Sequence, residues 1–167
     1  GEALASLPIK GRSPKTGYSR EQFGGGWQRI DNCDMRNYIL ARDLSETSFV
    51  TPGCKVASGT LDDPYSGKRI AFVRGPETSD DVQIDHVVAL SDAWQKGAQV
   101  LTSEQRAALA NDPLELLAVD GLDERLGQHG DAEGQRDHHV HQVLDGLVKD
   151  DPQFLAVADV VLAHSRV

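Results

Sequence analysis

The sequence predicts an α+β fold made of short strands and short helices. Three β-prone runs are separated by the turn sequences DDP, YSGK and GPETSDD, and they cover residues 55–60, 69–74 and 82–84. Helical patterns cover residues 35–44, 88–95 and 103–110. With 167 residues and 39% hydrophobic content, the chain is long enough for one packed domain and too short for two ordinary ones.

The N-terminal part predicts an arm followed by a core helix. Residues 1–20 are rich in Gly, Pro, Ser and Lys and should be extended, which leaves residues 21–167 as the single domain. The segment CDMRNYILARDL then places an apolar set on one helical face. We expect that face, formed by Met35, Ile39, Leu40 and Leu44, to pack on the core.

The charge of the chain limits its partners. The 17 basic and 26 acidic residues give a net charge of −9, the wrong sign for holding a polyanion by a general electrostatic field. Any contact with nucleic acid is therefore expected to be local. No apolar run is long enough to cross a bilayer, and the first residues lack the features of a signal peptide. We expect a soluble, exported monomer whose leader is absent.

The two cysteines, Cys33 and Cys54, lie 21 positions apart. A disulfide between them would stabilise the fold by roughly 3 kcal/mol in the chain-entropy model. A pair with no cysteine left over suits an exported protein. The alternative is two buried free thiols.

A possible metal-binding pair follows the run at residues 82–84. Asp85 and His86 end this apolar run, where an acid and a histidine could bind a divalent metal and activate a water on one surface. Leu114–Val119 is a second apolar run, able to pair with the first as a strand. Strand, Asp–His, strand and a following segment is the order of a ββα metal finger.

The intervening helix, over residues 103–110, has Ser103 as its expected N-cap. The sequence Asn111-Asp112-Pro113 should stop it.

These motifs resemble a known family. IDHVVALSDAWQKGA and ANDPLELLAVDG, preceded by CDMRNYILARDL and GTLDDPYSGKRIAFVRG, are similar to the HNH-type nucleases of the GmrSD C-terminal (DUF1524) family, especially its secreted actinobacterial members. The likeness spans residues 18–121. It implies a ββα-metal (HNH, or His-Me finger) core with flanking helices and short strands. It also implies one divalent cation and hydrolysis of phosphodiester bonds in DNA or RNA, with DNA favoured.

In this reading His86 is the general base, because imidazole titrates near neutral pH and can deprotonate water. Asp85 holds the metal, for which Mg²⁺ is favoured, with Mn²⁺, Ca²⁺ or Zn²⁺ as alternatives. The resemblance also implies an Asn that orients the backbone or the histidine. Asn111 is one candidate for this role, and Glu115 is the other.

Two further side chains lie on helical stretches next to the pair. Trp94 is expected in the core. Arg106 either contacts substrate phosphate or serves the fold.

The chain departs from the family pattern after Gly121. The family reads approximately TNxSKGD, whereas this chain reads GLDERLGQHGD. Glu124 takes the place of the expected Asn ligand and is the predicted second metal ligand, with Asp123 or His129 as alternatives. A one-nucleotide frameshift would restore a Thr-Asn pair here, and sequencing the locus tests that hypothesis.

Five of the six histidines lie from position 129 onward. Imidazoles suit transition metals, but these residues match no standard ligand spacing, so a solvated polar stretch is expected instead. They include His129, His138, His139 and His141. A closing helix is predicted over residues 151–164.

Two functions are compatible with the sequence. The first is an exported, metal-dependent endonuclease. The second is a catalytically silent relative that binds metal or a partner through its acidic surface.

Overall fold

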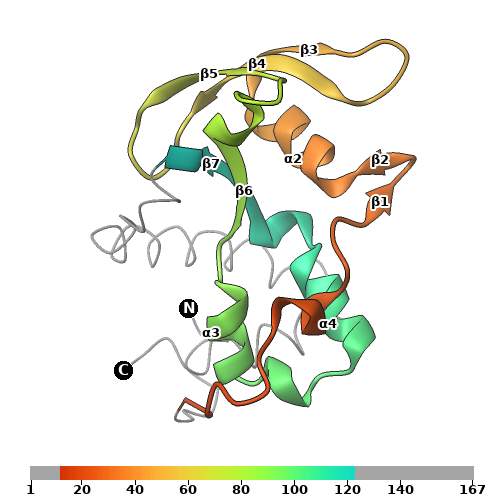
Figure 1. Cartoon of the computed structure of the whole chain (residues 1–167), viewed down its shortest axis with the longest axis vertical. Helices are drawn as coiled ribbons and strands as arrows, with labels where there is room; N and C mark the ends of the chain where they lie inside the picture. Colours follow the sequence, from red (N-terminus) through yellow and green to blue (C-terminus); the bar gives the residue numbers. More distant parts are fainter. Residues whose placement is uncertain (1–11, 123–167) are drawn as a thin grey trace, which may run out of the picture. The chain divides into compact units, whose positions relative to one another are not determined.

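The computed structural model describes residues 12–122, which form two compact units (Figure 1). Unit 1 comprises residues 12–25 and 88–115, and unit 2 comprises residues 26–87 and 116–122. The prediction of a single domain over residues 21–167 stays a prediction. Within the described residues, every helix is too short or too polar to cross a membrane.

Unit 2 is a small α+β structure, the class that the sequence predicts. Its strands form three antiparallel sheets, in the orders β1–β2, β3–β4–β5 and β6–β7. The strands are β1 (Arg29–Ile30), β2 (Cys33–Asp34), β3 (Ser45–Phe49), β4 (Val56–Asp62), β5 (Arg69–Val73), β6 (Val82–His86) and β7 (Leu116–Asp120). The helices are α2 (Met35–Asp43) and the 3-10 turn η2 (Ser79–Asp81).

The helix α2 supplies the centre of this unit. Asp34 caps its N-terminus by accepting a hydrogen bond from the backbone N of Asn37 at 2.8 Å. Its apolar face is buried as predicted, and Figure 1 shows the helix against the three-stranded sheet. The core comprises Met35, Ile39, Leu40, Leu44, Val56, Leu61, Phe72, Val82, Ile84, Leu116 and Ala118. The same cluster therefore fixes α2, the three-stranded sheet and the antiparallel pair of β6 and β7. We call this pair the β6–β7 hairpin, although residues 87–115 connect its strands.

The predicted pair of strands at residues 55–60 and 69–74 is confirmed as β4 and β5, which pair from Ser58↔Val73 to Asp62↔Arg69. The third strand of this sheet, β3, was not expected. Four of its five residues are exposed, so no alternation of apolar and polar side chains marks it in the sequence.

The second predicted pairing is also confirmed, because β6 and β7 form an antiparallel hairpin with His86 opposite Leu116. One boundary is corrected: β6 does not end at Ile84 but includes Asp85 and His86. The expected strand over residues 114–119 begins only at Leu116, because residues 113–115 form a 3-10 turn.

Side chains cover the edge of β7 that faces away from β6. Arg42 Nη2 donates to the carbonyl O of Leu116 at 2.7 Å, and Asp43 Oδ2 accepts from the N of Ala118 at 2.9 Å. Further along, Asp63 Oδ1 accepts from the N of Asp120 at 3.0 Å. Unpaired strand edges are costly or prone to mispairing, so these contacts fix the register and position of the hairpin.

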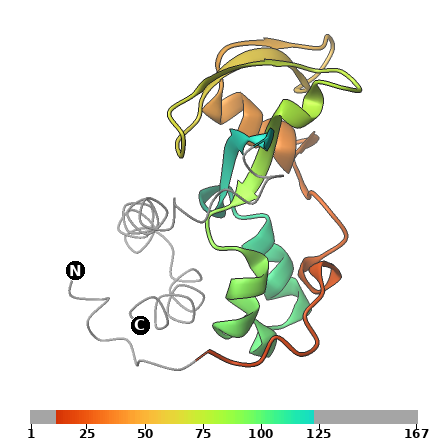
Figure 2. The ribbon, with the colours of Figure 1, turned by 60° about the vertical axis from the view of Figure 1, so that its left-hand side comes forward.

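Unit 1 is helical, and Figure 2 shows its two α-helices next to each other. Its elements are η1 (Arg20–Phe23), α3 (Leu90–Gln95), η3 (Ala98–Val100), α4 (Ser103–Ala110) and η4 (Pro113–Glu115). Tyr18, Phe23 and Trp94 pack edge to face with ring centroids 6.3 Å apart in each pair. This aromatic cluster confirms that Trp94 is a core residue.

The N-cap of α4 is Thr102 and not Ser103. Thr102 Oγ1 accepts from the N of Gln105 at 3.2 Å, while Gln105 Oε1 accepts from the N of Thr102 at 3.0 Å. This reciprocal capping box is available to Thr102 because Gln105 lies three residues after it. Ser103 is therefore the first helical residue.

Candidate active site

Asp85 and His86 are the last two residues of β6. His86 is on the buried side of the strand and only 8% exposed, whereas Asp85 is half-buried on the other side. Neighbouring side chains of a strand point to opposite faces, so the pair does not share one surface of the strand as the sequence suggested. Asp85 Oδ1 accepts from the N of His86 at 2.9 Å, which turns the carboxylate toward the end of the strand. A metal site that both side chains reach would therefore lie beyond the C-terminal end of β6.

The imidazole of His86 stacks on the indole of Trp27. Their ring centroids are 6.2 Å apart and their planes differ by 15°. Sequence reasoning missed Trp27, because it follows a glycine run and is separated from His86 by 59 positions, with no local pattern to connect them.

Glu115 holds the backbone just after His86. Its Oε2 accepts from the N of Val88 at 3.3 Å, and Glu115 is only 5% exposed. Burial raises the pKa of Glu115 to about 7, because it disfavours the charged carboxylate. The nearby Asp112 adds to this effect, while the hydrogen bond from Val88 opposes it.

Asn111 has a different set of contacts. It is the C-cap of α4, is 6% exposed, and its Nδ2 donates to the carbonyl O of Ala107 at 3.0 Å. Of the two candidates for the orienting role, Glu115 is the one that binds the backbone after His86. A catalytic role for Asn111 stays a prediction.

Arg106 makes contacts that serve the fold of unit 1. Its guanidinium donates to the backbone O of Gln22 at 2.8 Å, to Gln22 Oε1 at 3.1 Å and to the carbonyl O of Leu101, and lies 5.6 Å from the ring centroid of Trp94. Its predicted contact with substrate phosphate stays a prediction.

The donor chemistry of Asp85 suits a divalent cation, since its carboxylate offers the hard oxygen ligands that Mg²⁺ prefers. Among residues 12–122, no three His, Cys, Asp or Glu side chains gather closely enough to hold a metal. The predicted ligand Glu124 lies outside the described residues, as do its alternatives Asp123 and His129, the histidine-rich stretch and the predicted closing helix.

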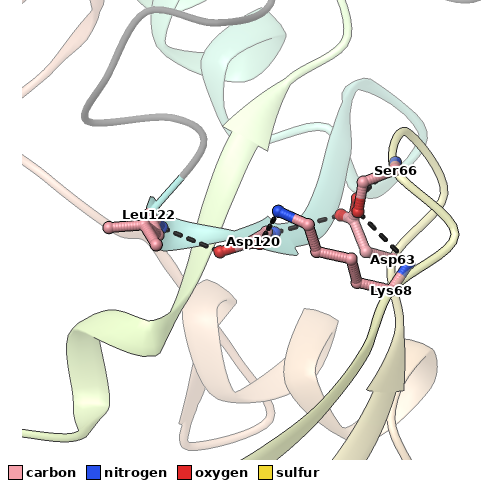
Figure 3. A network of polar contacts seen from close by, with 5 residues as sticks. All are labelled: Asp63, Ser66, Lys68, Asp120 and Leu122. Carbon is pink, nitrogen blue, oxygen red and sulfur yellow. Dashed lines mark hydrogen bonds and ion pairs between the residues drawn. The ribbon is translucent and has the colours of Figure 1, made fainter.

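A polar network marks the point where the chain leaves β7 (Figure 3). Asp63 Oδ2 accepts from both the N and the Oγ of Ser66, at 2.6 and 2.7 Å. Asp120 Oδ2 lies 3.1 Å from Lys68 Nζ, and its Oδ1 accepts from the N of Leu122 at 2.9 Å. Such a contact to the second following residue is typical of a helix N-cap.

The residues just after Asp120 are helical and crowded. Residues 121 and 122 take up helical conformation. A Cβ placed on Gly121 would lie 1.9 Å from the carbonyl O of Asp80, so only glycine fits here without a shift. Asp120 and Gly121 thus direct the chain out of the hairpin.

The cysteines form a disulfide, which settles the choice between a bridge and two free thiols. Cys33 and Cys54 are bonded, with their Cα atoms 5.8 Å apart. The bond ties β2, at the start of α2, to the segment before β4.

Fold and site together define a small disulfide-bonded α+β module with an acid–histidine pair on a β-hairpin. Residues 31–123 match the family described as "GmrSD restriction endonucleases, C-terminal domain". The chain belongs to this family and is a nuclease-related module. The match ends close to where the chain departs from the family pattern.

The chain is also similar to a secreted protein of another organism. An "Uncharacterized secreted protein" from Arthroderma benhamiae is 33% identical over 130 residues, which cover 76% of this chain and 60% of the relative. The chain thus spans about three-fifths of the length of that relative. No solved structure matches the chain significantly.

Proposed function

We propose that this protein is a metal-dependent endonuclease that hydrolyses phosphodiester bonds of nucleic acid. The observation that carries the proposal is the Asp85–His86 pair on the β6–β7 hairpin, inside the segment that matches restriction endonuclease domains. The description of that family favours DNA over RNA as the substrate. The helical residues 121–122 add support, because they follow β7 where a ββα core needs its helix.

His86 is the proposed general base. It takes a proton from the water that attacks phosphorus in line with the leaving oxygen. The residue is only 8% exposed, and its ring stacks on Trp27. Glu115 restricts the following backbone by accepting from Val88 N.

Asp85 is the proposed protein ligand of one divalent cation, with Glu124 as the second. Mg²⁺ is favoured, because a hard cation prefers oxygen ligands and needs few protein carboxylates when waters complete its coordination. When bound, the cation supplies charge stabilisation for the phosphate and the leaving oxygen.

The test is a cleavage assay on supercoiled plasmid and on RNA, with Mg²⁺, Mn²⁺, Ca²⁺, Zn²⁺ or EDTA. We expect cleavage that EDTA stops and that His86→Ala lowers by at least about 100-fold, the usual contribution of a general base. Gln83→Ala is the matched control, because Gln83 lies on the same strand and shares the half-buried side with Asp85. Cleavage that persists unchanged in folded His86→Ala would refute the proposal.

A catalytically silent metal- or partner-binding module is the second candidate. The net charge of −9 favours it, because an acidic chain suits a cation or a basic partner better than a polyanion. Calorimetry with Mg²⁺ or Mn²⁺ distinguishes the two: binding that Asp85→Asn abolishes, without cleavage of either nucleic acid, would support the silent module.

Export is proposed from the disulfide and from the secreted relative. Disulfides persist mainly in oxidising compartments. Thiol titration of protein produced in the cytosol and in the periplasm tests this, with full oxidation expected only in the periplasm.

A further inference from the structure

We propose that Trp27 is a positioning residue for His86, and that its indole sets the plane in which the imidazole meets the attacking water. The inference rests on the proposed nuclease function. It extends that function to a residue far away in sequence.

The contact has the geometry of an offset stack. The two rings are close to parallel, at 15°, and their centroids are 6.2 Å apart. Aromatic rings favour offset stacking over direct face-to-face contact. A face contact restricts rotation of the imidazole while its nitrogen atoms, on the ring edge, keep access to hydrogen-bond partners.

The indole itself is well anchored. Trp27 packs against the core cluster of unit 2 and directly precedes Gln28, whose carbonyl O accepts from the N of Met35 at 2.8 Å. The β1–β2 hairpin then follows, and the disulfide at Cys33 holds it to the segment before β4. Trp27 is thus held by the core cluster, by the start of α2 and by a nearby covalent link, and not by its contact with His86 alone.

For catalysis, the orientation of the His86 ring matters more than whether the space beside it is filled. A general base acts only when its nitrogen lies within hydrogen-bond reach of the proton it removes. A displacement of about 1 Å can cost about 100-fold in rate. An aliphatic side chain at position 27 would occupy part of the volume without defining a plane for the ring.

The kinetic test compares Trp27→Leu and Trp27→Met with Trp27→Phe. We expect kcat on a DNA oligonucleotide to fall about 10- to 100-fold in the aliphatic variants, with KM within about twofold. The phenyl ring of Trp27→Phe should restore most of kcat. Trp94→Phe removes an indole from the aromatic cluster of unit 1 and serves as the control for general loss of a tryptophan.

The spectroscopic test does not depend on activity. In two-dimensional NMR spectra of the full chain, the imidazole C–H signals of His86, assigned by their loss in His86→Ala, should shift in Trp27→Leu because the ring current of the indole is removed. Thermal unfolding of each variant checks that the fold is kept. If Trp27→Leu does not fold, Trp27→Phe against wild type gives the same comparison with a smaller expected shift.

The outcomes separate this inference from the proposed function. Unchanged His86 signals, or unchanged kcat with wild-type cleavage intact, would overturn the role of Trp27. A raised KM with normal kcat would also overturn it and make Trp27 a substrate-stacking residue. No cleavage by wild type under any metal would refute the nuclease proposal, while the NMR comparison would still decide the stacking.

Discussion

Replacing Glu115 with glutamine should make the protein more stable at neutral and alkaline pH. The pKa of this carboxyl is raised from 4.5 to about 7, chiefly because the side chain is buried. Between these two values the folded state binds more protons than the unfolded state, so wild-type stability falls as pH rises through this window. The loss is complete above about pH 7 and amounts to about 3 kcal/mol.

Glutamine removes this ionisation and keeps the contact with Val88, because its carbonyl can accept the same hydrogen bond. Urea unfolding of oxidised protein in EDTA should give similar free energies for both proteins near pH 4. At pH 8 the variant should be more stable by up to about 3 kcal/mol. Parallel profiles from pH 4 to pH 8, or a less stable variant at pH 8, would show that Glu115 is ionised in the fold without penalty.

Glu104→Gln is a control for which the opposite pH dependence of stability is expected. Glu104 is exposed in the first turn of α4, and hydrogen bonds lower its pKa, first from its own backbone and then from Thr102 and Ser103. Its contribution to stability is present above its ordinary pKa and is lost as pH falls. The glutamine variant should therefore be less stable than wild type at neutral pH and equal to it in acid.

Three further changes test the anchors of unit 2 by urea unfolding. Replacing Cys33 and Cys54 together by serine should lower the free energy of unfolding by roughly 3 kcal/mol, and an equal stability would place the bond outside the folding unit. Asp63→Ala removes an acceptor of three hydrogen bonds and should cost about 3 kcal/mol, with Asp63→Asn costing less because its amide oxygen still accepts; equal costs would show that only the charged carboxylate makes these contacts. Gly121→Ala forces a Cβ against the Asp80 carbonyl and should cost at least about 2 kcal/mol; an unchanged stability would show that the turn moves freely.

Those parts of the fold that have a local signal were predictable from sequence. The face of α2 follows helical spacing, and β4, β5, β6 and β7 are apolar or alternating runs between turn residues. β3 has no such signal, because it is a mostly exposed edge strand and its polar residues gain their structure only from pairing with β4. The N-cap of α4 was misplaced by one residue because Thr102 and Ser103 can both cap, and Gln105 decides between them.

The candidate site also has a part that the local sequence predicts and a part that it does not. The position of Asp85 and His86 at a strand end follows from the sequence around them, whereas their partners come from distant segments. Trp27 reaches His86 only through the fold of unit 2. Only the fold shows that the Glu115 carboxylate accepts from Val88 N while the Asn111 amide donates to Ala107 O, and spacing along the chain does not encode this difference.

The net charge of −9 has a consequence for how this chain binds a polyanion. Several of its basic side chains make contacts within the fold: Arg42 binds Asp43 and the β7 edge, Lys68 pairs with Asp120, and Arg106 binds backbone carbonyls. We expect phosphate to be recognised through a metal ion at Asp85 more than through a basic surface. DNA binding is then best measured on His86→Ala, which should cleave little. It should require the metal and depend only weakly on salt concentration. Fluorescence anisotropy should show a slope of about −2 for log affinity against log salt, the value for two phosphate contacts. A slope of about −5, or equal binding in EDTA, would mean that a basic surface binds the nucleic acid and that the metal serves the chemistry alone.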